Sequence, residues 1–307
     1  MHKGQHVIPP LAWAGLLSVS LLWGGSFLAI HAALVEIPVA TLVAFRVGIA
    51  ALALWIYVLA MGLAVPRGAR AWVDLLVLGA INNVIPFLLI AWGQRTIPTG
   101  LAAILNASTA IFGVLLAAAF LRDERLTRRR IAGILLGFAG VTVAIGIENL
   151  QSLDLRSLAQ LAVILASVSY GMASVWARLT QSRSHPVTSA AGMLTCSSVM
   201  AIPAALVIDG VPSFDYSATT IAAMTWLALL STALAFIIFY AVLARIGAAN
   251  TSVTTLLVAP IAILLGAVVL GEALRPSAYL GFMLLTAGLL VLDGRLVARL
   301  RRGLSAS

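Results

Sequence analysis

Apolar stretches of about 20 residues recur along the chain, and each is ended by Arg, Pro, Gly or acidic residues. A helix of about 20 residues crosses a hydrocarbon layer about 30 Å thick. The two-residue alternation of a membrane-spanning β-strand is absent. The sequence therefore predicts an all-α integral membrane protein with ten transmembrane helices, over 11–34, 38–60, 72–93, 98–121, 130–147, 156–179, 187–208, 217–244, 248–270 and 277–294.

The composition agrees with a lipid bilayer as the surroundings of this chain. Charged residues make up 9% of it and hydrophobic residues 62%, whereas soluble domains carry about 25% charged residues. The single cysteine, Cys196, excludes an intrachain disulfide, and the four histidines lack the clustered spacing of a structural metal site. We therefore expect no metal ion and no cofactor.

The basic residues lie mainly in the gaps between the apolar stretches, and their distribution predicts an orientation. Lys and Arg in short loops stay on the cytoplasmic side of a membrane. With the N-terminus on that side, the opposite face holds only Arg95, Arg156 and Arg275, and one further arginine, Arg46, lies inside a span. We expect both termini in the cytoplasm, with 295–307 as a basic cytoplasmic tail. This topology accounts for the net charge of +9 without a nucleic-acid partner.

An internal repeat relates the two parts of the chain. A shift of 148 residues places Glu124 over Glu272, Gly133 over Gly281 and Gly140 over Gly288. The repeat predicts two domains, 11–147 and 156–294, with five spans in each. Because five is odd, the second repeat would be inverted in the membrane relative to the first. Inverted repeats are typical of secondary transporters, with the substrate at the midplane between the halves.

The residues themselves resemble a known family. LLWGGSFLAIHAAL and IPVATLVAFRVGIAALAL, with the later LRDERLTRRRIAGILLGFAGV, are similar to an EamA-type half of the drug/metabolite transporter superfamily, and so is TTLLVAPIAILLGAVVLGEAL in the second half. The resemblance covers roughly 11–294. It implies a bacterial inner-membrane carrier that exports small molecules such as amino acids or toxic amphiphilic compounds. The second half departs from the family pattern at one place, where Tyr170-Gly171 stands at the position of Trp23-Gly24 in the first half.

Several polar residues lie near the middle of their spans, where an unpaired polar group is costly. Asn82 and Asn83 occupy the middle of the third span and either join helices or line a cavity. Pro86 follows within about one turn and should kink that span, as Pro260 should kink the ninth. The remaining candidates for the substrate cavity share this depth or have large rings that could form its walls: Trp23, Asn106, Thr109, Tyr170, Thr254 and Thr255.

Arg46 is the one charged residue placed clearly inside a span. Such a residue needs partners in the membrane. Either its guanidinium is a fixed positive site for a substrate carboxylate, or it is a structural anchor that binds helix ends or extends toward the interface. Glu124 and Glu272, in turns beside helix starts, are interpreted as caps. Glycines of the fifth and tenth spans predict a close-packed seam between halves or protomers, which leaves a homodimer open.

The sequence disfavours two other classes of function, an intramembrane enzyme and a membrane scaffold. An intramembrane enzyme would need an embedded nucleophile with its base or paired carboxylates, and the sequence offers neither. A membrane scaffold would need longer loops for partners. The sequence favours a secondary transporter that moves a small-molecule substrate by alternating access, with no nucleotide-binding motif for direct use of ATP.

Overall fold

The computed structural model describes residues 9–121, 126–145, 155–180, 185–251 and 253–293. Within these ranges the regular structure is entirely helical. The first half contains α1 (Pro10–Ala33), α2 (Val39–Ala60), α3 (Ala69–Gly79), the π-helical turn η1 (Ala80–Val84), α4 (Ile85–Gly93), α5 (Thr99–Asn106), α6 (Thr109–Phe120) and α7 (Arg128–Ile145). The second half contains α9 (Leu155–Thr180), α10 (Pro186–Ile208), α11 (Ala218–Thr225), the π-helical turn η2 (Trp226–Leu234), α12 (Ala235–Thr251), α13 (Val253–Leu270) and α14 (Pro276–Asp293).

Seven helical segments of the described chain are long and apolar enough to cross a membrane. Two shorter apolar helices, 257–270 and 276–291, lie within α13 and α14. Leu52, Ile56 and Leu59 form a stripe on α2 in which each side chain is more than 60% exposed. A stripe of this kind is unfavourable in water and suits contact with lipid chains. The protein is therefore an integral membrane protein.

Prolines mark the beginnings of many helices. Pro38 and Pro98 stand directly before α2 and α5, and α10 and α14 begin with Pro186 and Pro276. A proline fits the first turn of a helix because its missing N–H has no intrahelical acceptor there. These prolines thus mark where α2, α5, α10 and α14 begin.

The third span of each half contains a π-helical turn. Nearer the start of each half the repeat shift is 147 residues, which pairs Trp23-Gly24 with Tyr170-Gly171, and this shift carries η1 onto 227–231, which lies inside η2. Single π-helical turns inside α-helices are rare and occur frequently at functional sites. Their matched positions indicate that the repeat preserves a local irregularity as well as the order of helices.

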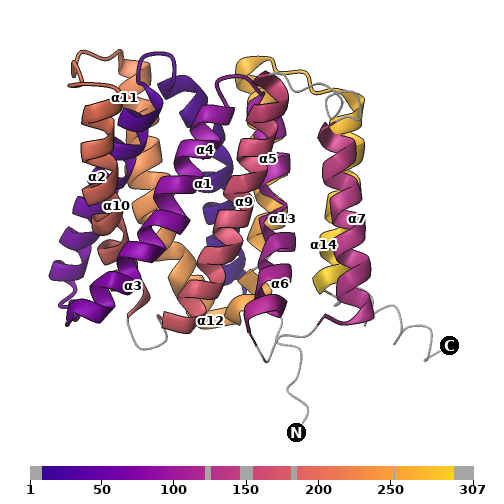
Figure 1. Cartoon of the computed structure of the whole chain (residues 1–307), viewed down its shortest axis with the longest axis horizontal. Coiled ribbons are helices and arrows are strands. Elements are labelled where there is room, and N and C mark those ends of the chain that lie inside the picture. The colour runs from indigo at the N-terminus through magenta and orange to yellow at the C-terminus, as the bar shows by residue number, and fades with distance from the viewer. Residues whose placement is uncertain (1–8, 122–125, 146–154, 181–184, 252, 294–307) are drawn as a thin grey trace, which may run out of the picture.

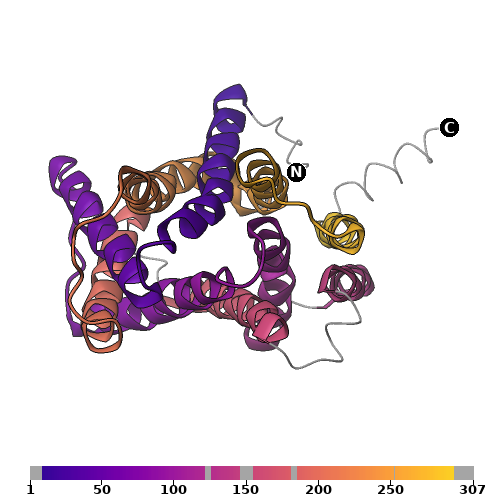
Figure 2. The same ribbon diagram turned by 90° about the horizontal axis from the view of Figure 1, so that it is seen from above.

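The two halves are interleaved (Figures 1 and 2). From the first half, α1 packs against α12 and α13, and from the second half α9 packs against α4 and α6. The second spans, α2 and α10, pack along each other, as do the last spans, α7 and α14. Figure 2 shows α7 and α14 side by side at one end of the molecule, outside the ring formed by the other helices. Most of the interior is therefore shared between the repeats.

Glycines form the contact between α7 and α14. A Cβ atom added at Gly288 would lie 2.6 Å from the backbone nitrogen of Gly137 and 2.7 Å from the carbonyl oxygen of Gly133. Gly140 and Gly281 approach the opposite backbone equally closely. The seam expected from the small residues is present, and it joins the two halves of one chain.

Candidate functional site

The Arg46 side chain is buried between the halves. It is 6% exposed, and its Nε donates a hydrogen bond to Oγ1 of Thr232 on η2 over 3.0 Å. Its guanidinium carbon lies 3.7 Å from the ring centroid of Phe87 on α4, in cation–π contact. Oγ1 of Thr232 donates in turn to the carbonyl of Leu227 over 2.7 Å. The sequence left open that the Arg46 side chain extends to the membrane interface. That alternative is wrong, because the guanidinium is buried inside the bundle.

Trp23 on α1 contacts the same π-helical turn. Its Nε1 donates to the carbonyl of Ser231 over 3.1 Å, and its ring centroid lies 5.2 Å from that of Phe239. Phe239 meets Tyr240 at 5.6 Å in a T-shaped contact. Trp23 and Arg46 therefore bind neighbouring residues of η2 from two different helices of the first half, and aromatic rings of α12 extend the wall.

Tyr170 occupies the position in α9 that the repeat pairs with Trp23. Its ring is half-buried against the main apolar core. The preceding residue, Ser169, donates to the carbonyl of Ile81 in η1 over 2.6 Å. The first span of each half thus contacts the π-helical turn of the other half, which is the relationship expected of a repeat with exchanged contacts.

Asn82 and Asn83 lie in η1 and face α10. Nδ2 of Asn83, whose side chain is fully buried, donates to Oγ of Ser197 over 3.0 Å. Nδ2 of Asn82 donates to Oδ1 of Asn83 over 3.3 Å and lies 3.5 Å from the sulfur of Met193. Asn83 therefore joins helices in this conformation, and the half-buried Asn82 is the more available of the two amides.

Asn106 and Thr109 flank a break in the fourth span. α5 ends at Asn106 and α6 begins at Thr109, whose Oγ1 donates to the carbonyl of Asn106 over 2.7 Å. Oδ1 of Asn106 and Oγ1 of Thr254 are buried without a hydrogen-bond partner in the described part of the chain. Such atoms are costly unless water or a ligand binds them. Thr255 lies on α13, and its side chain is outside the described residues.

The two prolines differ in their surroundings. Pro86 is the second residue of α4 and directly follows η1, so the helix is already irregular there. Pro260 lies inside α13, which continues to Leu270. That each proline kinks its helix at the site remains a prediction.

Two carboxylates join the halves at helix starts. Oε1 of Glu272 accepts from the backbone N of Thr99 over 2.8 Å, and Oε2 accepts from the Thr99 hydroxyl over 2.7 Å and from the N of Gly100 over 3.2 Å. Oδ2 of Asp209 binds the backbone N and the hydroxyl of Thr41 in the same manner, over 2.7 and 2.9 Å. Glu272 is a cap, as its position in the sequence predicts, and it caps a helix of the other half. Glu124 and the tail 295–307 lie outside the described residues.

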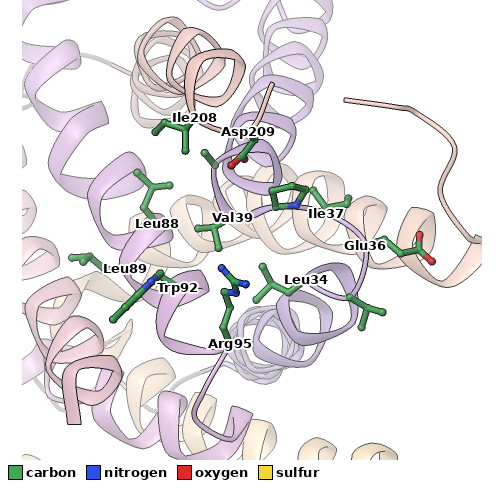
Figure 3. Close-up of a pocket in the computed structure, with 13 residues that line it drawn as sticks. Leu34, Glu36, Ile37, Val39, Leu88, Leu89, Trp92, Arg95, Ile208 and Asp209 are labelled. Carbon is green, nitrogen blue, oxygen red and sulfur yellow. The ribbon is translucent and has the colours of Figure 1, made fainter. Parts of the chain in front are cut away.

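A pocket of about 620 Å³ opens beside the connection between α1 and α2 (Figure 3). Its walls come from the α1–α2 connection, the start of α2, one face of α4 with Arg95 after it, and the end of α10. Trp92 and Arg95 lie on one side of it and Asp209 on another. This volume is in the range of small-molecule sites.

The comparison with known families settles the class of this molecule. Residues 11–146 and 157–292 each match the model of the EamA-like transporter family. The chain belongs to that family. It is therefore a small-molecule transporter built from two EamA-like repeats.

Relatives of this EamA-like transporter carry more specific descriptions. A probable terminal-alkyne amino-acid exporter of Streptantibioticus cattleyicolor is 30% identical over 290 residues, which are 94% of this chain and 95% of the relative. A probable amino-acid metabolite efflux pump of Escherichia coli (strain K12) is 26% identical, covering 90% of this chain and 92% of the pump. One crystal structure shares the fold with a TM-score of 0.68 at 21% identity, covering 94% of this chain and 98% of that chain.

Some residues of this EamA-like site carry no simple sequence signal. Phe87 is one apolar residue among many, and only the structure places it against Arg46. Ser231 and Thr232 are polar residues within a predicted span, so depth alone could have selected them. Gln160, with an unpartnered side-chain amide among the described residues, and Gln94, which donates to the carbonyl of Phe27 over 2.9 Å, are buried amides that the same search could have found.

Proposed function

We propose that this protein is a bacterial inner-membrane carrier that exports amino acids or related small amphiphilic molecules by alternating access. In this proposal ten transmembrane helices form two inverted repeats, 11–147 and 156–294, with both termini and the tail 295–307 in the cytoplasm. The relatives described as exporters of amino acids or their metabolites support the substrate class. The asymmetry of Lys and Arg between alternate loops supports the orientation.

The observation that carries the proposal is the buried guanidinium of Arg46 at the boundary between the halves. A positive group in a low-dielectric interior attracts a carboxylate strongly. Nε of Arg46 binds Thr232, and the guanidinium lies over the ring of Phe87. The two terminal guanidinium nitrogens remain to bind a substrate carboxylate in bidentate geometry. Trp23 and the half-buried Tyr170 supply apolar and aromatic surface for the substrate side chain.

Two buried oxygen atoms without hydrogen-bond partners in the described part of the chain are candidate contacts for the substrate amine. Oδ1 of Asn106 and Oγ1 of Thr254 belong to the fourth spans of the two halves. We propose Asn82, Thr109 and Thr255 as further contacts of this cavity. Rocking of the halves about these groups would expose them to the two sides of the membrane in turn.

Transport by the purified protein tests the proposal. Proteoliposomes would be loaded with unlabelled amino acid and assayed for counterflow of labelled leucine, glutamate, lysine and a lipophilic cation, with and without a pH step. Saturable counterflow of one amino-acid class supports the proposal. A folded protein that exchanges none of these compounds would contradict the substrate class and direct the search to other metabolites.

The orientation has a separate test. Val211 and Val65 are exposed residues in connections that the proposal assigns to opposite sides of the membrane. In a Cys196→Ser background, Val211→Cys should react with a membrane-impermeant maleimide in intact cells, and Val65→Cys should react only after the cells are opened. The reverse pattern would overturn the orientation.

A homodimer stays a prediction. The glycine seam of α7 and α14 joins the two halves of one chain, so a dimer would need another surface.

A further inference from the structure

The pocket beside the α1–α2 connection carries a positive charge that the described part of the protein leaves unpaired. Arg95 is exposed and follows α4, and no ion pair joins it to any residue that the structure describes. Figure 3 shows its guanidinium extending into the pocket toward Val39, between Trp92 and Leu34. The proposed orientation places this pocket on the outer side of the membrane.

The acidic residues of the pocket are already committed to helix starts. Oδ2 of Asp209 accepts from the backbone N and the hydroxyl of Thr41, in the first turn of α2. Oε2 of Glu36 accepts from the backbone N of Ser217, which stands before α11, over 2.9 Å. These hydrogen bonds hold both carboxylates at partially positive helix ends and away from Arg95. The guanidinium is therefore available to an anionic group.

The walls around Arg95 are apolar. Leu34, Val39, Leu88 and Leu89 contribute aliphatic side chains, and Trp92 contributes an indole ring. A pocket with apolar walls and few polar groups selects a ligand that has one charged end and an apolar body. A neutral amino acid with an aliphatic or aromatic side chain has that form, and its ammonium group would face Oδ1 of Asp209, the oxygen that the two bonds from Thr41 do not use.

The pocket shares two helices with the Arg46 site. On α2, Ala40 lines the pocket, and Arg46 follows it by about 9 Å at 1.5 Å per residue. On α4, Leu88 lines the pocket while its neighbour Phe87 lies against the Arg46 guanidinium. The two arginines thus lie at different depths beside the same pair of helices, α2 and α4.

We propose that Arg95 and the pocket walls form an outer subsite that binds the carboxylate of an apolar amino acid after it leaves Arg46. The inference rests on the proposed function, which supplies the substrate class. It adds a second carboxylate site, and it predicts that substrate binding from the outer side depends on Arg95 whereas binding from the inner side does not.

A chemical protection experiment tests binding without transport. The full-length protein in nanodiscs would be treated with phenylglyoxal, which modifies accessible arginines, and the modification of Arg95 and Arg275 would be followed by peptide mass spectrometry. Leucine should slow modification of Arg95, and leucinamide, which lacks the carboxylate, should not. Equal protection by both compounds, or protection by neither, would overturn the inference. Protection by anionic lipid in place of leucine would identify a lipid headgroup site and also overturn it.

A transport experiment tests the sidedness. In right-side-out vesicles, Arg95→Gln should raise the outer half-saturation concentration for leucine about 10-fold and leave the inner value unchanged, because a hydrogen-bonded charge pair is lost on one side only. Arg275→Gln is the matched control, since it removes another exposed arginine of the same proposed face that does not line the pocket. An equal effect of both variants, or no effect of Arg95→Gln, would contradict the subsite. A wild-type protein that moves no amino acid would contradict the proposed function, and the protection of Arg95 would still decide the subsite.

Discussion

Arg46 of the first half and Thr232 of the second half are joined by a hydrogen bond from Nε to Oγ1 over 3.0 Å, in the interior of the bundle. The threonine lies in a π-helical turn, and its hydroxyl donates to the carbonyl of Leu227, five residues earlier. The Thr232 hydroxyl therefore accepts a hydrogen bond from the first half and donates one within the second half. This pair fixes the direction of the guanidinium that the proposed function uses.

Substitution of Thr232 tests this fixed direction. Thr232→Val keeps the shape of the side chain and removes the acceptor, so the Arg46 Nε–H is left without its partner. We expect amino-acid counterflow to fall about 10-fold, corresponding to about 1.4 kcal/mol. Thr232→Ser keeps the hydroxyl and should retain most of the activity. Equal activity of the Val and Ser variants, both folded, would show that the hydrogen bond does not matter for transport.

Glu272 should stabilise the contact between the halves. Its carboxylate accepts three hydrogen bonds from Thr99 and Gly100 at the start of α5. Glu272→Ala removes them all, and we expect the free energy of unfolding to fall by about 1–2 kcal/mol. Thermal unfolding in detergent measures the change. The control is Asp215→Asn, which alters an exposed carboxylate and should unfold at the wild-type temperature.

Glu36 should give the fold a dependence on acid pH. Its hydrogen bonds with Ser217 lower the pKa of the carboxyl from its ordinary value of 4.5. Because the folded pKa is the lower one, the contribution to stability is complete above about pH 4.5 and is lost as the pH falls through the folded pKa. The unfolding temperatures of the wild type and Glu36→Gln should therefore differ most above about pH 4.5 and converge as the pH falls through the folded pKa. A difference between them that is constant from about pH 6 to about pH 3 would contradict this assignment.

The glycine seam predicts a steric requirement at α7 and α14. Gly288→Leu places a side chain against the backbone of Gly133 and Gly137, and we expect a loss of about 3 kcal/mol or failure to fold. Gly113→Ala is the control, because no atom outside the adjoining residues and backbone of its own helix lies within 4 Å of the added Cβ. Expression and unfolding temperature should be kept in the control. A stable Gly288→Leu protein would mean that the seam is not a close backbone contact in the membrane.

Much of the architecture follows from simple features of the sequence. Apolar length predicts the spans, and the shift that pairs Glu124 with Glu272 predicts the two repeats. The cap at Glu272 was also predictable, since an acidic residue in a turn favours a nearby helix start. These features depend on local composition and spacing, which a single sequence contains.

The contacts of the candidate site could not be predicted in the same way. The interleaving of α1 with α12 and α13, and of α9 with α4 and α6, decides which side chains meet. Depth in the membrane identifies Arg46 and Asn83 as candidate site residues. It does not predict that Phe87 contacts Arg46 or that Ser197 accepts a hydrogen bond from Asn83. The sequence pattern also does not predict the π-helical turns. Their i to i+5 hydrogen bonds lie within helices whose apolar composition is ordinary.

The most direct test of the account is counterflow of labelled leucine by proteoliposomes that contain the wild type, Arg46→Gln or Gly113→Ala, each first shown to be folded by its unfolding temperature. We predict saturable counterflow for the wild type and for Gly113→Ala. For Arg46→Gln we predict less than about one-tenth of that rate, because the buried positive group for the carboxylate is gone. Full counterflow by Arg46→Gln would contradict a substrate site at the boundary between the halves.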